Sequence, residues 1–261
     1  MSAGYRDARG PLAIAHRGGA GLAAENTLAA FARSYALGLR YLETDVRLSA
    51  DGQLMAFHDA GLLRVTDRPG KVRQHSAEEL GMLPVLGGGP IVTLADLLAR
   101  FPDARFTIDV KEPRTIAPLA QLLRATDSAH RVCIAGMRGG WLADLRRLTS
   151  PELTLALSWR ELARLAARSA PTDPRGEFAH VPLRLGRFRV YTDELLARAH
   201  GRGIRVIVWT VNDSSIMHRL LDRGVDGIIT DRPDVLREVL VARGQWHAPE
   251  SYDASVGDLV S

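Results

Sequence analysis

The sequence predicts one (β/α)₈ barrel of the α/β class, and three observations support this prediction. The chain has 261 residues, and about 250 residues is the usual size of a single barrel of this kind. Short apolar runs alternate with helix-like segments almost to the end of the chain, and eight such strand and helix units can be counted. An open doubly wound sheet is the structural alternative, but no Gly-x-Gly-x-x-Gly turn follows the first expected strand.

The first elements are expected between residues 12 and 59. The run LAIAHRG (12–18) predicts a strand, and NTLAAFARSYALG (26–38) has apolar residues at helical spacing with a glycine at its end. The second strand is YLETDVRLS (41–49). Asp51-Gly52 is a hairpin signal, so QLMAFHD (53–59) should return alongside that strand.

Residues 60–92 interrupt the rhythm and predict a small insertion or long loop after the second strand, because they are rich in Gly, Pro and charge. The alternation then resumes. The remaining expected strands are FTIDVK (106–111), RVCIAG (131–136), LTLALSW (153–159), FAHVPL (178–183), RVIVWTV (205–211) and DGIIT (226–230). One domain is therefore expected over residues 10–245, and residues 246–261, which lose the periodicity, predict a surface tail.

Composition limits the classes of function. Apolar residues make up 46% and charged residues 25% of the chain, as in soluble globular proteins. No stretch reaches the roughly 18 apolar residues that span a bilayer, so a cytoplasmic protein is expected. Cys133 is the only cysteine, which excludes an internal disulfide and a thiolate zinc cluster. The net charge of +4 with scattered arginines favours a small anionic substrate over nucleic acid and leaves the oligomeric state open.

The first two strands supply polar residues suited to catalysis. His16 and Arg17 stand at the end of the first strand, where barrel active sites form, although a structural hydrogen bond and a solvated arginine are the simpler interpretation. Glu43 and Asp45 alternate on the second strand and should point to one face, about 7 Å apart. Such a pair needs a positive partner, and Mg²⁺ or Ca²⁺ is the simplest one. An edge strand with solvated acids is the alternative.

Three further positions complete the predicted site. The hairpin should bring His58 back toward the carboxylates as a second proton carrier, unless it is a surface histidine. Asp109 and Lys111 share a face of FTIDVK as a metal ligand and a phosphate binder, or as a simple ion pair; only one other lysine, Lys71, occurs in the chain. Trp209 is a substrate wall or a core residue. The other six histidines, at positions 75, 130, 180, 200, 218 and 247, have no comparable setting.

Together these motifs closely resemble the glycerophosphodiester phosphodiesterase family, over roughly residues 14–238. The resemblance is carried by His-Arg-Gly at 16–18, Glu-Asn-Thr at 25–27, Glu-Thr-Asp-Val at 43–46, Asp-Gly at 51–52, His-Asp at 58–59, Trp-Thr-Val-Asn at 209–212 and Gly-Val-Asp-Gly-Ile at 224–228. The order of the motifs is highly specific, whereas each motif alone is weak. Three departures stand out: Ala24 replaces a proline, Asp109 replaces a glutamate, and Ala135-Gly136 replaces a Ser-Phe pair.

The resemblance implies metal-dependent hydrolysis of glycerophosphodiesters to glycerol phosphate and an alcohol on a (β/α)₈ barrel. Position by position, it implies His16 and His58 as the acid/base pair, Arg17 and Lys111 as phosphate binders, and Glu43, Asp45 and Asp109 as ligands of a divalent metal, Mg²⁺ or Ca²⁺. A lysophospholipase D, a metal-independent phospholipase C and a noncatalytic phosphodiester-binding barrel remain as alternatives. Apolar residues in 60–92 and beside Ala135-Gly136 would favour the first of these.

Overall fold

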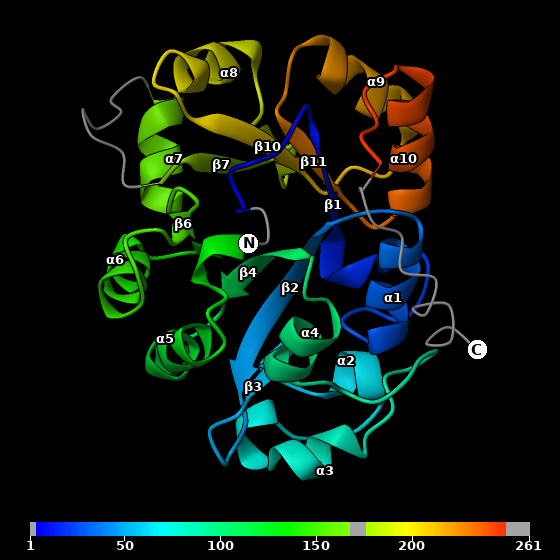
Figure 1. Ribbon diagram of the computed structural model, residues 1–261, viewed down its shortest axis with the longest axis vertical. Helices are drawn as coiled ribbons and strands as arrows, with labels where there is room; N and C mark the ends of the chain where they lie inside the picture. Colours follow the sequence, from blue (N-terminus) through cyan, green and yellow to red (C-terminus); the bar gives the residue numbers. More distant parts are fainter. Residues whose placement is uncertain (1–3, 168–175, 249–261) are drawn as a thin grey trace.

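The computed structural model describes residues 4–167 and 176–248 and consists of alternating strands and helices (Figure 1). The parallel strands are β1 (Leu12–Ala15), β2 (Tyr41–Leu48), β4 (Arg105–Val110), β5 (Val132–Gly136), β6 (Thr154–Leu155), β7 (Phe178–Pro182), β10 (Arg205–Trp209) and β11 (Gly227–Thr230). The helices that follow them are α1 (Leu28–Ala36), α4 (Leu94–Arg100), α5 (Ile116–Ala125), α6 (Gly139–Leu148), α7 (Trp159–Ala166), α8 (Asp193–His200), α9 (Ser214–Asp222) and α10 (Pro233–Ala242). Each strand is thus followed by one main helix.

The strands form a nearly closed barrel. They neighbour one another in the order β6-β5-β4-β2-β1-β11-β10-β7, and every pairing along this path is parallel. A parallel bridge between Ala156 and Phe178 joins the two ends, where Leu157 N donates to Phe178 O at 2.7 Å. The predicted (β/α)₈ barrel is confirmed, and the open doubly wound sheet is excluded.

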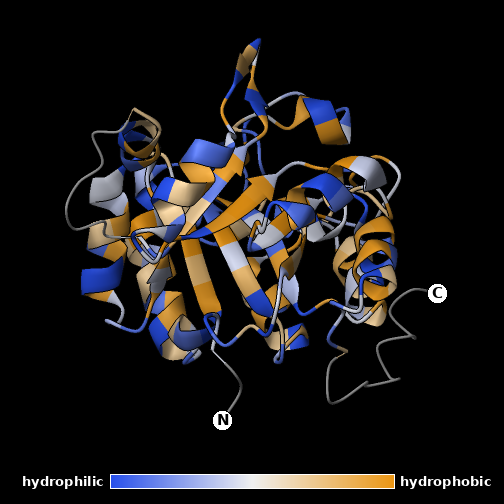
Figure 2. Cartoon of the chain, turned by 90° about the horizontal axis from the view of Figure 1, so that it is seen from above, coloured by the Kyte–Doolittle hydropathy of each residue, from blue (hydrophilic) through white to orange (hydrophobic). Residues whose placement is uncertain are grey.

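Apolar residues fill two layers. One lies between the strands and the helices, and the other fills the barrel interior; Figure 2 shows the central strands as mainly apolar. Tyr5, from the segment before β1, is fully buried in the inner layer. Its hydroxyl lies 2.6 Å from Thr107 Oγ1, and its ring meets those of Tyr41 and Phe178 edge-on at 5.2 and 5.4 Å. The first residues of the described chain therefore close the floor of the barrel.

The predicted hairpin after β2 is present. Strand β3 (Leu54–Ala56) pairs antiparallel with β2, with Val46 opposite Ala56. Gly52, with a φ of +82°, takes the left-handed conformation that the turn requires and that glycine adopts without strain. Phe57 N then donates to Asp45 O at 3.0 Å. The hairpin therefore returns the chain to Asp45 on β2 immediately before His58.

Residues 60–92 are more regular than their composition indicates. They contain α2 (Leu63–Thr66), the 3-10 turn η2 (Val72–Gln74) and α3 (Ala77–Gly81), which lie at the lower end of Figure 1 beside β3. Ser76 and Glu79 form a reciprocal capping box at the start of α3. A separate buried apolar cluster, which includes Met55, Leu62 and Leu80, holds the segment to the hairpin. The segment and the hairpin thus share a small apolar core of their own.

The end of the chain is described only as far as residue 248, so most of the expected tail, 246–261, lies outside the described residues. Of its first residues, Trp246 packs against the core, with the Arg237 guanidinium 5.7 Å from its ring centroid. None of the helices in residues 4–167 and 176–248 is long and apolar enough to cross a membrane.

Candidate active site

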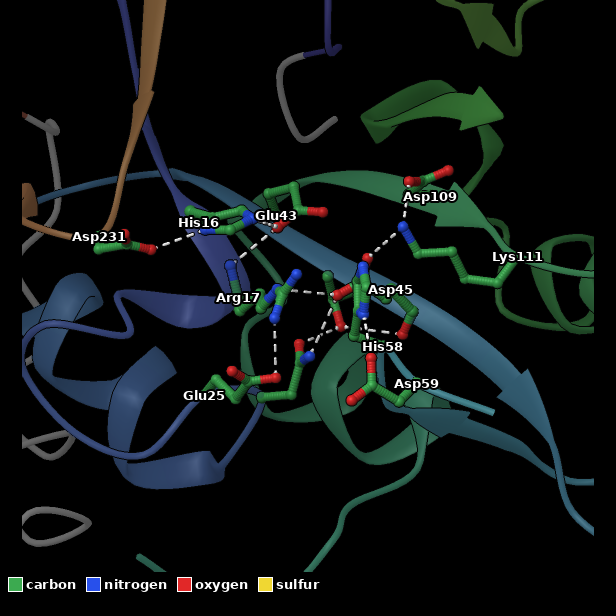
Figure 3. A network of polar contacts seen from close by, with 12 residues as sticks. His16, Arg17, Glu25, Glu43, Asp45, His58, Asp59, Asp109, Lys111 and Asp231 are labelled. Atoms are coloured by element: carbon green, nitrogen blue, oxygen red, sulfur yellow. Dashed lines mark hydrogen bonds and ion pairs between the residues drawn. The ribbon is translucent and has the colours of Figure 1, made fainter. Parts of the chain in front are cut away.

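One cavity opens at the carboxyl ends of the strands, the end of a barrel where catalytic residues gather. It has a volume of about 730 Å³, including the space at its mouth. All eight residues that the sequence singles out line it: His16, Arg17, Glu43, Asp45, His58, Asp109, Lys111 and Trp209. The structure therefore brings the predicted residues together (Figure 3).

His16 is held by a carboxylate from the far end of the chain. The pairing of β1 with β11 sets Ala15 beside Thr230, so the next residues, His16 and Asp231, meet with His16 Nδ1 and Asp231 Oδ1 2.7 Å apart. Asn212 Nδ2 donates to the other Asp231 oxygen at 2.8 Å. Although Asp231 stands just before α10, it does not cap that helix, because α10 begins after Arg232 without a side-chain cap.

The pKa of His16 reflects this environment. Burial alone lowers it, but the hydrogen bond to Asp231 and the charge of Glu43, whose Oε2 is 4.0 Å from His16 Nε2, outweigh burial and raise the pKa above its ordinary value. Asp231 keeps a lowered pKa because its hydrogen bonds to His16 and Asn212 outweigh its own burial. The imidazole is thus fixed through Nδ1, while the Nε2 side borders the cavity residue Glu43.

A left-handed turn after β1 places Arg17. Its φ is +49°, which is uncommon for a residue other than glycine or asparagine, and this turns its amide to donate to Glu43 Oε2 at 2.8 Å. Gly18 follows with a φ of +80°, and a Cβ there would lie 3.0 Å from the Phe31 ring. The His-Arg-Gly motif therefore serves a tight backbone turn as well as side-chain chemistry.

The Glu25-Asn26-Thr27 motif, in the loop after β1, supports the site through hydrogen bonds to its charged residues. Glu25 accepts from Arg17 Nη1 at 2.9 Å and from Arg64 of the insertion. Asn26 Nδ2 donates to Asp45 Oδ2 at 3.3 Å, and Thr27 caps α1. The motif thus ties the first loop of the barrel to β2 and to the insertion.

Asp45 is almost completely buried and is surrounded by cations. Lys111 Nζ lies 2.9 Å from Asp45 Oδ1 and 2.5 Å from Asp109 Oδ2, and Arg17 Nε lies 3.3 Å from Asp45 Oδ2. Burial raises the pKa of Asp45, but Lys111 and Arg17 outweigh it and lower the pKa overall. The ion pair of Asp109 with Lys111, which the sequence left open as an alternative, is therefore present, and Lys111 extends it to Asp45.

Glu43 has fewer compensating charges than Asp45. It is buried on the same face of β2, and burial together with repulsion from Asp45 raises its pKa to about 7. This is the signature of a carboxylate whose negative charge is poorly offset by its neighbours. Of the two carboxylates on β2, Glu43 is thus the one with less positive charge beside it.

His58 mirrors His16 in its support. Its Nδ1 lies 2.6 Å from Asp59 Oδ1, and the other Asp59 oxygen accepts from Arg64 Nε. Arg64 also binds Glu25, so the hairpin residue His58 is connected to the first loop through three charged side chains. His16 and His58 therefore each have Nδ1 engaged by an aspartate.

The opposite wall of the cavity is apolar. It is formed by side chains at the ends of β5, β6 and β10 and at the start of α7: Ala135, Leu157, Trp159, Leu162 and Trp209. The Trp159 and Trp209 rings meet edge-on, with centroids 6.4 Å apart. Two buried nitrogens on this side, Trp209 Nε1 and His180 Nε2, have no hydrogen-bond partner in the described chain.

Sequence reasoning missed three of these residues. The sequence around His180 indicates no special setting, yet the residue lines the cavity, and burial lowers its pKa to about 4, so it is neutral. Asp231 contacts His16, and Arg64 contacts Glu25 and Asp59. The alternation in FAHVPL places His180 on the inner face of β7 with Phe178, which was the signal available for it.

The acids fit a hard divalent cation. Three carboxylates but only two permanent cations line the cavity: Glu43, Asp45 and Asp109 against Arg17 and Lys111. Mg²⁺ and Ca²⁺ prefer such oxygen ligands, and one of them would offset the charge of Glu43. In residues 4–167 and 176–248 no three His, Cys, Asp or Glu side chains are already grouped to hold one ion. Asp109 already contacts Lys111 Nζ through its Oδ2.

Comparison with known proteins gives consistent matches. The model of the Glycerophosphoryl diester phosphodiesterase family matches residues 16–235. A Mycobacterium tuberculosis protein named Probable glycerophosphodiester phosphodiesterase 2 is 35% identical over 246 residues, covering 91% of this chain and 93% of its own. Human Lysophospholipase D GDPD1 is 25% identical, covering 87% and 85%. The crystal structure of glycerophosphodiester phosphodiesterase from Agrobacterium tumefaciens superimposes with a TM-score of 0.73 at 23% identity, covering 89% and 100%.

Proposed function

The chain belongs to the glycerophosphoryl diester phosphodiesterase family, and on that premise we propose that His16 and His58 catalyse hydrolysis of glycerophosphodiesters in its cavity. The family's enzymes are phosphoric diester hydrolases, and the products are glycerol phosphate and an alcohol. One observation carries the proposed mechanism: two imidazoles, each held through Nδ1 by an aspartate, line one cavity together with Arg17 and Lys111.

The two histidines are suited to opposite proton transfers. With Nδ1 engaged by Asp231 or Asp59, each ring has Nε2 left for the substrate. One Nε2 accepts a proton from the attacking oxygen, and the other donates a proton to the leaving alcohol. The raised pKa of His16 favours its protonated form near neutral pH, so we assign it the donation of the proton.

Arg17 and Lys111 are proposed to bind the phosphate oxygens. Both are partly buried and both already contact carboxylates, so they are held in place before substrate arrives. Because the acids outnumber them, they cannot by themselves make the cavity attractive to an anion. The binding of a phosphodiester therefore requires further positive charge.

That charge is proposed to come from a divalent metal, on which the family commonly depends. Mg²⁺ or Ca²⁺ would be held by Glu43 and Asp45, with Asp109 as a further ligand. When bound, the ion supplies positive charge next to the phosphoryl oxygens. Glu43 and Asp45 serve to position it beside His16 and Lys111, whose contacts with these acids are already formed.

Asp231 is a positioning residue in this proposal, and Asp231→Ala should lower turnover about 10- to 100-fold, because an unsupported imidazole loses its orientation and tautomer. Asp231→Asn keeps an oxygen that can accept from His16 Nδ1 and should retain more activity than the alanine variant. Steady-state turnover of glycerophosphocholine measures both. Equal activity of Asp231→Ala and the parent protein, at unchanged melting temperature, would contradict this role.

A lysophospholipase D activity is a second candidate, favoured by the apolar wall of the cavity at Ala135, Leu157 and Leu162. An acyl chain needs such a surface, whereas a deacylated diester does not. If this candidate holds, lysophosphatidylcholine should be turned over with a kcat/KM at least comparable with that of glycerophosphocholine. Mass-spectrometric detection of lysophosphatidic acid provides the measurement. Turnover of glycerophosphocholine alone would restrict the enzyme to deacylated diesters.

A further inference from the structure

The loops after β5 and β7 expose apolar side chains beside the cavity. Met137 is 66% exposed, Leu185 56% and Phe188 66%. The other large exposed apolar residues in the described chain are three in the insertion, Leu63, Met82 and Leu86, and one on α10, Val241. Strands β5 and β7 flank β6, so their loops emerge one strand apart at the mouth. We call Met137–Arg138 and Arg184–Arg189 the rim patch.

The rim patch is basic as well as apolar. It contains four arginines, at positions 138, 184, 187 and 189, and no acidic residue. In the described chain none of the four forms an ion pair, whereas exposed arginines elsewhere, such as Arg223 and Arg232, are paired with aspartates. The Arg187 guanidinium lies 5.1 Å from the Phe188 ring centroid, and Arg189 Nε donates to the Tyr191 carbonyl oxygen. The patch therefore presents uncompensated positive charge.

A small hairpin orders these side chains. Strands β8 (Arg184–Leu185) and β9 (Phe188–Arg189) pair antiparallel, with Leu185 opposite Phe188 and Arg184 opposite Arg189. Residues opposite one another share a face, so one face of the hairpin is apolar and the other is basic. Every residue from 184 to 189 is exposed, so neither face packs on the barrel. A hairpin with both faces in water buries little apolar surface, so a contribution to the stability of the barrel does not explain its apolar side chains.

We propose that the rim patch docks the enzyme on an anionic phospholipid surface, with the cavity mouth toward the bilayer. Charge complementarity identifies this partner: each arginine gains attraction near an anionic surface, while Leu185, Phe188 and Met137 enter the apolar boundary below the headgroups. The apolar wall of the cavity, which begins at Ala135 beside Met137, continues this surface inward. The delivery of lipid-bearing diesters to the cavity rests on the proposed function, whereas docking itself does not.

Vesicle sedimentation tests docking directly. The full chain with His16→Ala is mixed with vesicles of phosphatidylcholine alone or of phosphatidylcholine with phosphatidylserine. The protein is expected to bind the anionic vesicles, and this binding should be lost as the salt concentration rises. Replacing Arg184, Arg187 and Arg189 by Gln should weaken partitioning about 100-fold, and Leu185→Ser with Phe188→Ser about as much.

Matched controls separate the patch from general charge and hydrophobicity. Arg9, Arg100 and Arg202 are exposed at the opposite end of the barrel, before β1, β4 and β10. Their replacement by Gln removes the same charge and should leave vesicle binding largely intact. Val241→Ser, on the outer helix α10, is the apolar control.

Two results would overturn the inference. One is a His16→Ala protein with an intact rim patch that sediments no better with anionic than with neutral vesicles. The other is a protein that is dimeric in solution, binds no vesicles and becomes monomeric when Leu185→Ser and Phe188→Ser are combined. That result would show that the patch contacts a second copy of the chain. Turnover of water-soluble glycerophosphocholine is measured with the patch substitutions made in the chain that retains His16, and it should be unchanged. Failure of the parent protein to hydrolyse it would count against the proposed function alone.

Discussion

Replacing His16 or His58 by Ala should lower turnover of a glycerophosphodiester by about 10²- to 10⁴-fold, while the barrel stays folded. Each variant removes one of the two imidazoles proposed as proton carriers, so one of the two proposed proton transfers loses its carrier. Neither ring belongs to the buried apolar clusters that hold the barrel together. Release of glycerol phosphate in a coupled assay provides the measurement.

His200 offers a matched control for this experiment. Its Nε2 lies 2.8 Å from Asp226 Oδ2, so it is also a histidine paired with an aspartate, but it stands at the end of α8 and does not line the cavity. His200→Ala should keep nearly full turnover. Full activity in purified His16→Ala would remove His16 from the mechanism, and the same holds for His58→Ala.

Removal of divalent metal should abolish turnover, which should return when Mg²⁺ or Ca²⁺ is added back to the EDTA-treated protein. The physical reason is the excess of carboxylates over permanent cations around the cavity, which repels an anionic substrate. Calorimetric titration adds a readout independent of activity: Glu43→Gln and Asp45→Asn should weaken metal binding, whereas Glu152→Gln, an exposed residue after α6, should not.

Undiminished turnover in EDTA would contradict the proposed metal dependence. It would then favour chemistry of the metal-independent phospholipase C kind, in which two histidines and cationic side chains suffice. Metal binding that is unaffected by both Glu43→Gln and Asp45→Asn would instead place the ion elsewhere in the protein.

The barrel could be predicted because its signals are local. Alternation of apolar strands and amphipathic helices requires only neighbouring residues, and the Asp51-Gly52 turn identifies the hairpin by itself. The period of two along YLETDV places Glu43 and Asp45 on one face, and the structure buries both. The helices of residues 60–92 were harder to predict, because their short length and many Gly and Pro residues weaken every periodic signal.

The residues that support the site could not be read from the sequence, because barrel closure creates their contacts. Asp231 meets His16 across 215 positions, and Arg64 reaches Glu25 across 39. A local reading assigns Asp231 to the nearest helix start, since capping is the commonest role of an aspartate in that place. Lys111 illustrates the same limit: its pairing with Asp109 is local, whereas its contact with Asp45 depends on the register of β2 and β4.

The tyrosine in the barrel floor also constrains the order in which a newly made chain can fold. Tyr5 precedes every strand of the barrel in the chain, but its hydroxyl partner Thr107 is synthesised 102 positions later, and Phe178 later still. Strand β1 can pair with β2 early, but its other edge waits for β11, the last strand of the described residues. A nascent chain must therefore carry one open edge of β1 until β11 is made, and long-range pairing of this kind is slow and prone to aggregation.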